Sequence, residues 1–281
     1  MHTAVGCKPM LRHAVIGYGR LARALVPALQ AAGHGVVIGR RRPAVSDLTA
    51  AEATRQADWV WLTVPDDCIA ATAAALPWRA GQLALHCSGA TPLDALAPAP
   101  CVAGFHPLKL LAGDGALSGA LSGAYVGIEA DAAHRPALVA LAQTMGLVPL
   151  NLPSPMSSQA RAAYHAAANL SASGVLAVLA EAQALWSAAG LPEPQALAAL
   201  LPLTRGALDS ALAHGLAGSV SGPVARGDAG VLARHLDATA HAGLPADLLR
   251  ALALRQLGLA EAAGRLDAAQ LTALKTLLAP G

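Results

Sequence analysis

Two glycines and an alanine near the start of the chain have the spacing of a phosphate-binding loop. Gly17 and Gly19 follow a short apolar run, and Ala22 stands three residues further on. Gly17 permits a tight turn, Gly19 lets the backbone approach a pyrophosphate, and Ala22 lets a helix pack closely against a strand. Free N–H groups and the helix dipole then attract phosphate. The residues predicted to contact a dinucleotide here are Gly17, Tyr18, Gly19, Arg20, Leu21 and Ala22.

Arginines follow the second predicted strand, at the position that selects between the two nicotinamide cofactors. In an NAD-binding unit, an acidic residue about 20 positions beyond the glycines holds the ribose 2′-hydroxyl. Here Gly39 is followed by three arginines and by no acid. A guanidinium offers a planar fork that suits a phosphate, so Arg40 and Arg41 predict NADP as the cofactor. The alternative is a solvated basic turn.

A stripe of polar residues recurs every four positions on a long predicted helix: Arg161, His165, Asn169 and Ser173. Successive members are rotated by about 40°, so they share one face. The other faces are nearly all apolar, as in a helix buried on most sides, so we expect the stripe to line a cleft. The alternative is a solvated face. Histidine titrates near neutrality, so His165 is the candidate acid catalyst. Asn169 would orient the acceptor, and Ser173 would contact substrate.

Further candidates lie in predicted loops. Val64 and Pro65 end a strand, and loops at the carboxyl ends of such strands line the cofactor crevice, so we expect them on the adenosine side. His106 stands beside a proline at another strand end and is a second candidate acid that would contact substrate; a structural role is the alternative. Arg226, between two helices, could bind an anionic substrate group bidentately. An ordinary helix connection is the alternative there.

Alternating strands and helices must position these residues. Apolar runs predict strands at 14–16, 35–39, 58–65, 82–87, 101–105, 125–129 and 147–150, with helices over 21–32 and 132–145. This alternation predicts an α/β fold with a Rossmann-like, doubly wound, mostly parallel sheet. Asp66 precedes a further helix and is expected to cap it.

The strand signals stop after Pro153 and Pro155. Helices are then predicted at 157–189, 195–214, 229–242, 245–264 and 267–278, with Asp228 capping the third. We therefore expect a dinucleotide-binding domain over 1–152 and an all-helical C-terminal substrate and dimerisation domain over 153–281. The helices at 229–242 and 245–264 carry more apolar surface than a small helical domain needs to bury, which predicts a homodimer through this domain.

Composition excludes several classes of function. The 281 residues carry a net charge of +2 spread along the chain, which argues against a nucleic-acid partner. No run of about 18 residues is free of charged or strongly polar interruption, so no membrane span is predicted. The N-terminus shows no export signal, which favours a cytoplasmic protein. The cysteines and histidines lack the spacing of metal ligands, so no metal is expected.

Several motifs occurring in order resemble a bacterial family of NADP-binding reductases with a helical C-terminal domain of unknown function. These are GYGRLA, TVPDDCI, HCSGA, FHPL, YHAAA and SGPVARGD followed by HL, which together span nearly the whole chain. The architecture is similar to pyrroline-5-carboxylate reductase and the β-hydroxyacid dehydrogenases. The resemblance implies NADP use and a dimer, and places the turn at Ser88 and Gly89 near the nicotinamide. His165 and Asn169 resemble an i, i+4 polar pair of the β-hydroxyacid dehydrogenases, which have lysine at the first position.

The chain also departs from the family pattern in two places. Ala172-Ser173 stands where family members usually carry Ser-Asn, and Lys-Leu-Leu follows FHPL in place of a polar run. Both departures concern substrate contacts and leave the predicted fold unchanged. The sequence therefore predicts an NADPH-dependent reductase of a small carbonyl or imine substrate, bound in the cleft between the two domains. The alternative is a non-catalytic sensor that binds NADP(H) without turnover.

Overall fold

The computed structural model describes residues 11–41, 47–111 and 119–279, and divides the chain into two compact units. The first unit, Met1–Ala172, contains the sheet, and the second, Ser173–Gly281, is helical. Each is described by itself below, as the sheet unit and the helical unit.

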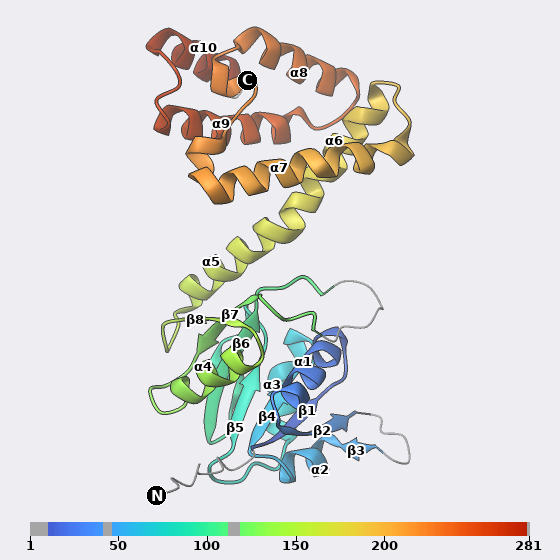
Figure 1. Cartoon of the computed structure of the whole chain (residues 1–281), viewed down its shortest axis with the longest axis vertical. Coiled ribbons are helices and arrows are strands. Elements are labelled where there is room, and N and C mark those ends of the chain that lie inside the picture. Colours follow the sequence, from blue (N-terminus) through green and yellow to red (C-terminus); the bar gives the residue numbers. More distant parts are fainter. Residues whose placement is uncertain (1–10, 42–46, 112–118, 280–281) are drawn as a thin grey trace, which may run out of the picture. The chain divides into compact units, whose positions relative to one another are not determined.

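An eight-stranded sheet forms the centre of the sheet unit (Figure 1). Its strands are β1 (Arg12–Ile16), β2 (Gly35–Arg40), β3 (Leu48–Thr49), β4 (Trp59–Leu62), β5 (Leu83–His86), β6 (Cys101–Pro107), β7 (Tyr125–Glu129) and β8 (Val148–Asn151). Their order in the sheet is β3-β2-β1-β4-β5-β6-β7-β8. Every neighbouring pair is parallel except β6 and β7. The predicted mostly parallel, doubly wound sheet is confirmed, with β3 as an unpredicted addition.

Helices cover both faces of the sheet, which is why the central strands are apolar runs and do not alternate. Helices α1 (Arg20–Ala31) and α4 (Arg135–Thr144) pack on one face around Trp61 and Phe105. Helices α2 (Ala50–Arg55) and α3 (Ile69–Ala75) cover the other face, with the short 3₁₀ helix η2 (Leu93–Leu96). The carboxyl ends of the parallel strands therefore stay free to carry a site.

Buried histidines interrupt this apolar core, and His13 is one of them. His13 of β1 is fully buried, and its Nδ1 accepts a hydrogen bond of 2.9 Å from Trp61 Nε1. The ring of His34 lies edge-on at 4.7 Å between centroids. Burial, reinforced by His34, lowers the pKa of His13 to about 3, so this imidazole is neutral at pH 7.

The predicted long helix runs from Ser158 to Ala188 in three segments. Helix α5 (Ser158–Asn169) is capped by Ser157, whose hydroxyl accepts from Ala160 N. It continues through a π-helical turn, η3 (Leu170–Gly174), into α6 (Val175–Ala188). The two units divide inside this helix, whereas the predicted domains divide at 152/153. Helix α5 groups with the sheet because its side chains bind groups on β6 and β7.

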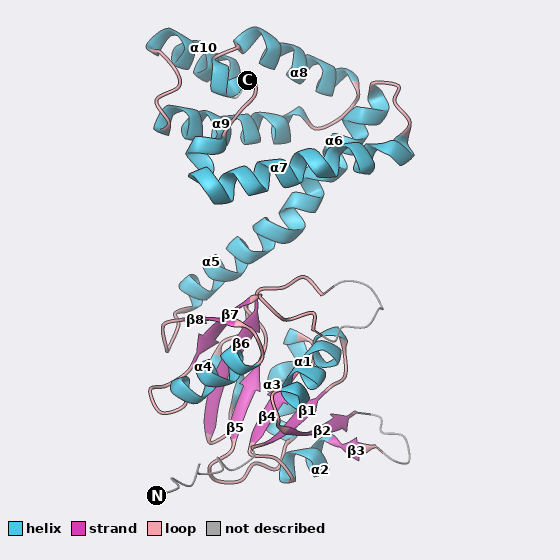
Figure 2. Ribbon diagram, in the orientation of Figure 1, coloured by secondary structure: helices cyan, strands magenta, loops and turns pink. Residues whose placement is uncertain are grey.

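The rest of the helical unit consists of α7 (Glu193–Ser219), α8 (Ala229–His241), α9 (Ala246–Ala262) and α10 (Ala268–Leu278), as Figure 2 shows. The predicted helices are confirmed, although Gly215 breaks α7 with a φ of 72° and a ψ of 169°. Asp228 caps α8 as predicted, since its Oδ1 accepts from Val231 N at 2.9 Å.

Large apolar side chains are exposed on α6 and α7. Leu203 and Leu212 of α7 are 73% and 89% exposed, and Leu176 and Val178 of α6 are also exposed. The predicted excess is not found on 229–242, where Leu232 and Leu236 of α8 are buried, but Leu254 of α9 is 43% exposed. The expectation of a long helix buried on most sides is also wrong. Between Ser158 and Ala188 the structure buries only Arg161 and Leu179.

Within the described residues, two helical stretches are long and apolar enough to cross a membrane, judged by length and composition alone. They are Ser158–Ala188 and Glu193–Ser219, each with a mean hydropathy of 1.2 and 6% of its window buried. The sequence pattern predicts no such stretch, because charged or strongly polar residues interrupt each apolar run. Alanine and leucine nevertheless outweigh those few charges, so the exclusion by composition does not hold.

Candidate functional site

The predicted phosphate-binding loop has the geometry its residues require. Gly17 has a φ of 90°, and its N–H donates to Gly39 O at 3.0 Å. A Cβ on Gly17 would lie 3.1 Å from both Thr63 O and a methyl of Val64, so the turn has no room for a side chain. Open space surrounds the position a Cβ would take on Gly19, the residue that precedes α1. A phosphate could approach the backbone there.

Ala22 is fully buried under the loop, as predicted for close packing of helix on strand. The first intrahelical hydrogen bond runs from Arg23 N to Gly19 O, so the N–H groups of Arg20, Leu21 and Ala22 point from the free end of the helix. This end carries the positive pole of the α1 dipole. The loop therefore fits the pyrophosphate of a dinucleotide.

Arg40 ends β2 beside this loop. Its guanidinium carbon lies 5.0 Å from the centroid of the Tyr18 ring, and its Nε lies 3.1 Å from Asp47 Oδ2. Arg41 follows as an exposed residue, and Arg42 lies outside the described residues. The loop and the arginine predicted to select NADP are thus brought together.

The end of β4 packs against the same loop. Thr63 donates its hydroxyl hydrogen to the backbone oxygens of Ile16 and Gly17, at 3.1 Å and 3.0 Å. A methyl group of Val64 fills the space next to Gly17, and the following residue, Pro65, is exposed. Val64 therefore lies beside the loop, and Thr63 is a supporting residue that the sequence did not single out.

The turn at Ser88 and Gly89 follows β5 and is held by its own hydroxyl. Ser88 Oγ donates to Asp66 Oδ2 at 2.7 Å, and accepts from the backbone N–H groups of Ala90 and Thr91 at 3.1 and 3.0 Å. The expectation that Asp66 caps a helix is wrong. Asp66 opens the 3₁₀ helix η1 (Asp66–Cys68), and its carboxylate faces Ser88. Gly89 is left to present its backbone.

Two histidines converge on Gly89. A Cβ on Gly89 would lie 2.7 Å from His106 Cε1 and 3.0 Å from His165 Cδ2, so only glycine fits between them. The two imidazole centroids are 6.4 Å apart. His106 comes from β6, His165 from α5 and Gly89 from the end of β5. The structure thus gathers three residues that the sequence analysis had selected separately.

Tyr164 joins this cluster. Its hydroxyl lies 2.9 Å from His106 Nδ1, within hydrogen-bonding distance. A Cβ on Gly127 of β7 would lie 2.5 Å from the Tyr164 hydroxyl, so Gly127 makes room for it. Burial, with His165 nearby, lowers the pKa of His106 to about 4, and burial raises the pKa of Tyr164. At pH 7 the pair is therefore a neutral imidazole and a protonated phenol.

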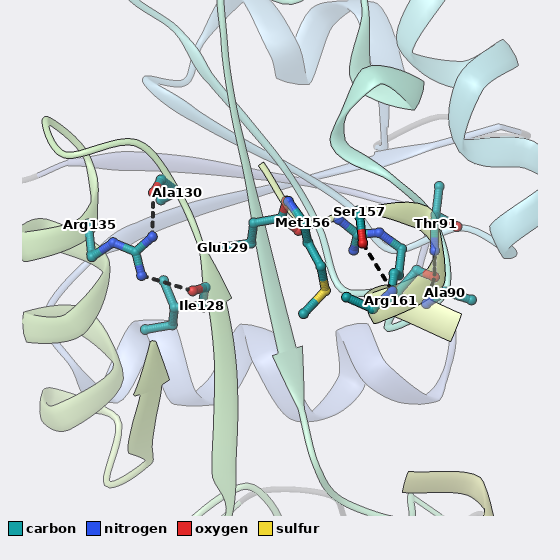
Figure 3. A network of polar contacts seen from close by, with 11 residues as sticks. Ala90, Thr91, Ile128, Glu129, Ala130, Arg135, Met156, Ser157 and Arg161 are labelled. Atoms are coloured by element: carbon teal, nitrogen blue, oxygen red, sulfur yellow. Dashed lines mark hydrogen bonds and ion pairs between the residues drawn. The ribbon is translucent and has the colours of Figure 1, made fainter. Parts of the chain in front are cut away.

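Arg161 is buried in an ion pair with Glu129 of β7 (Figure 3). Glu129 is buried too, and its second oxygen accepts from Met156 N at 2.9 Å. A charge in such a position requires its partner, because desolvation without compensation is very costly. The first member of the polar stripe is thus an anchor that fixes α5 on the sheet.

Two cavities flank α5 within the sheet unit. One, of about 610 Å³, is lined by Ala90, Pro92, Ser158, Arg161, Ala162, His165, Ala166, Asn169 and Leu170. The other, of about 640 Å³, is lined by His106–Leu110, Tyr164, His165, Ala167–Asn169, Ser171 and Ala172. Both are large enough for a small-molecule substrate. His165 and Asn169 line both, so the stripe does face hollowed surface there.

The remaining two predicted substrate contacts lie in the helical unit. Ser173 is an exposed residue of the π-helical turn η3. Arg226 ends the 3₁₀ helix η4 (Val224–Arg226) with an exposed side chain, and its backbone oxygen accepts from Gln270 Nε2 at 3.1 Å. No group of three or more potential metal ligands occurs in the part of the chain that the structure describes.

Residues 124–256 match the family model described as a domain of unknown function, DUF2520. The fold is similar to protein TM1727 from Thermotoga maritima, with 22% identity over 90% of this chain and 100% of that chain (TM-score 0.68). It is also similar to a reductive aminase from Aspergillus terreus in complex with NADPH and ethyl-5-oxohexanoate, with 17% identity over 91% and 94% of the two chains (TM-score 0.61).

A third similar structure is a variant imine reductase from Myxococcus stipitatus in complex with NAD+, with 15% identity over 94% and 99% of the two chains (TM-score 0.56). A search of curated proteins finds no match. At these identities the likenesses establish the fold, a Rossmann-like domain followed by a helical part. Together with the matched domain, they confirm the resemblance found from the motifs.

Proposed function

We propose that the protein is an NADPH-dependent reductase of a small carbonyl or imine compound. The observation that carries the proposal is the meeting of Gly89, His106 and His165 at the carboxyl edge of a sheet whose first strand ends in a dinucleotide loop. In open α/β sheets, ligands bind outside the carboxyl ends of the strands. The similar structures that hold NADPH with an oxo compound, or NAD+, favour the same class of chemistry.

The residues of the loop fit the cofactor. The N-terminal N–H groups of α1 would bind the pyrophosphate, and Arg40 would bind the 2′-phosphate with Arg41 as a second cation. Val64 and Pro65 would border the adenosine. The backbone at Gly89 would approach the nicotinamide, because no side chain stands in the way.

Bound NADPH would supply hydride, and the chain must orient the acceptor and provide a proton. His165 reaches the cavities on both sides of α5, so we assign it the proton transfer, with Asn169 orienting the acceptor oxygen or nitrogen. The Tyr164–His106 pair borders the second cavity and holds a phenolic proton at neutral pH. It is the second candidate donor, and His106 keeps its predicted place among the substrate contacts.

Turnover tests this proposal directly. NADPH oxidation is measured with a panel of small keto acids and cyclic imines, for the native chain and for His165→Ala. General acid catalysis contributes about 10²–10⁴ in rate, so His165→Ala should lower turnover by that order and leave NADPH affinity and melting temperature nearly unchanged. Asn169→Ala should lose less. Gln159→Ala, on the same helix outside both cavities, is the matched control.

The rival function, a sensor that binds NADP(H) without turnover, makes the opposite prediction. The native chain would then bind NADPH tightly and oxidise it with no member of the panel. A fully active but destabilised His165→Ala protein would retire the catalytic assignment alone. Arg40→Ala tests cofactor choice separately. Loss of a charge-assisted contact of about 1.5–3 kcal/mol should weaken NADPH binding roughly tenfold or more and leave NADH binding unchanged.

We also infer that two chains assemble through the helical unit. The exposed leucines of α6 and α7 form more apolar surface than a soluble single chain ordinarily presents. A bilayer is the other apolar environment that would cover them. A membrane span is disfavoured for Ser158–Ala188, the first of the two long apolar stretches. This stretch carries Arg161 and Tyr164, which bind Glu129 and His106 of the sheet. That stretch therefore cannot span a membrane along its whole length. Ser173 and Arg226 remain proposed substrate contacts, and the cytoplasmic location remains a prediction.

A further inference from the structure

We propose that Asp47 competes with the cofactor's 2′-phosphate for Arg40 and so sets how strongly the protein prefers NADPH over NADH. The inference deepens the proposed function and depends on it. It concerns an acidic residue that neither the glycine spacing nor the arginine run points to.

The position of Asp47 follows from the sheet. Arg40 is the last residue of β2, and Asp47 directly precedes β3, which pairs with β2 in parallel register: Gly39 with Leu48 and Arg40 with Thr49. This pairing brings Asp47 to the end of β2, where Arg40 lies. Arg40 Nε and Asp47 Oδ2 are 3.1 Å apart.

Arg40 is held in place independently of Asp47. Its guanidinium carbon lies 5.0 Å from the centroid of the Tyr18 ring, which stands between the two glycines of the loop. A guanidinium over an aromatic face is attracted by the ring quadrupole. Gly39, the residue before it, accepts from Gly17 N at 3.0 Å. The cation thus stays beside the phosphate-binding loop whether or not Asp47 pairs with it.

An acid in this place has opposite consequences for the two cofactors. A 2′-phosphate that binds Arg40 shares its positive charge with Asp47 and lies close to the negative charge of that carboxylate, which opposes binding. NADH carries no phosphate there and leaves the Arg40–Asp47 pair intact. Asp47 therefore lowers the affinity for NADPH selectively, and the preference is weaker than the arginines alone would give.

The size of the effect follows from exposure. The side chains of Arg40 and Asp47 are 42% and 31% exposed, so the pair is screened by water. Exposed pairs contribute up to about 1 kcal/mol, which corresponds to roughly fivefold in affinity, and removing the repulsion adds to this. We expect Asp47→Asn to tighten NADPH binding roughly five- to tenfold.

The experiment measures dissociation constants of NADPH and NADH by nucleotide fluorescence for the native chain, Asp47→Asn, Arg40→Ala and the double variant. Asp47→Asn should tighten NADPH and change NADH by less than about twofold. In the Arg40→Ala background the same substitution should tighten NADPH binding clearly less, since only the repulsion between Asp47 and the 2′-phosphate is then removed. Asp94→Asn makes the same charge change at an exposed residue of η2 and is the control.

Each result decides the matter. Unchanged or weaker NADPH binding by Asp47→Asn overturns the inference, and so does an equal gain for NADH, since a general change of charge would then explain it. A gain of the same size in the Arg40→Ala background also overturns it. If the native chain binds no NADPH at all, the proposed function fails together with the inference. NADPH binding without an Asp47 effect removes the inference alone.

Discussion

The sheet unit and the helical unit treat their large apolar side chains in opposite ways. In the sheet unit, Trp61, Phe105 and Leu25 are fully buried between helices on both faces. In the helical unit, Leu203 and Leu212 stand 73% and 89% exposed. The first unit therefore covers its large apolar side chains with its own chain. The second leaves large apolar side chains exposed, which is the basis of the proposed assembly.

The largest expected effect is a loss of stability when the buried ion pair of the sheet unit is broken. Glu129→Gln leaves the buried charge of Arg161 without its partner, which should lower the free energy of unfolding by about 3–5 kcal/mol. Urea unfolding followed by tryptophan fluorescence measures it. The double variant Glu129→Gln/Arg161→Met removes both charges and should recover much of the loss. Equal losses in the single and double variants would contradict the ion-pair explanation.

A second substitution tests the proposed dimer through the exposed apolar surface of the helical unit. Leu203→Asp places a charge on exposed apolar surface of α7, and its desolvation in an interface should raise the dimer dissociation constant at least about 100-fold. Light scattering across a concentration series measures the change. Tyr125→Asp, at an exposed residue of β7, is the control and should leave assembly intact. A native chain that is monomeric at micromolar concentration would refute the dimer, and vesicle binding abolished by Leu203→Asp would favour a membrane surface.

Lowering the pH should destabilise the sheet unit in particular, because it contains the buried histidines. The pKa of His13 is about 3 in the fold, against 6.5 for an unperturbed histidine, because burial disfavours its charged form. Above pH 6.5 it is neutral in both states and contributes nothing to pH dependence. Below that, only the unfolded chain takes up the proton, so stability falls by about 1.4 kcal/mol per pH unit, or about 2 kcal/mol by pH 5.

His86 and His106 act in the same direction, since burial lowers the pKa of each to about 4. Unfolding free energies at pH 7 and pH 5 test the sum, and His13→Gln isolates one share. That variant should lose less stability than the native chain between the two pH values. An identical loss in both would show that His13 does not carry the dependence.

The smallest expected effect concerns a cap in the helical unit. Asp228→Ala removes the acceptor for Val231 N at the start of α8 and should cost about 1 kcal/mol. If assembly supplies much of this unit's stability, the loss in melting temperature should grow as the protein is diluted. A loss independent of concentration would indicate that the helical unit is stable on its own.

Local sequence patterns predicted the fold well, because both strands and helices can be recognised from short stretches of sequence. The turn at Gly17, the burial of Ala22 and the arginine at the end of β2 follow from residue types alone. The surface that covers a helix does not follow from residue types alone. The long helix was expected to be buried, yet its apolar faces are exposed, since burial depends on surfaces that its own periodicity does not specify.

The residues missed around the site share one property: their partners are distant in the chain. Asp66 resembles a helix cap in sequence and instead binds Ser88, and Asp47 returns to Arg40 through the pairing of β3 with β2. Tyr164 looks like an ordinary aromatic residue of a helix until His106 is placed beside it. The roles of His165 and Asn169 in catalysis remain predictions, although their position beside two cavities is now known.

The bare backbone of Gly127 has a consequence for how relatives of this chain diverge. Any side chain at position 127 would collide with the Tyr164 hydroxyl, since even a Cβ would lie 2.5 Å from it. A lineage that replaces Gly127 must therefore shorten or reorient residue 164, and in doing so it releases His106 from its hydrogen bond. Positions 127, 164 and 106 should change together across evolution, on three separate elements. A comparison of related sequences can detect this covariation without any measurement of activity.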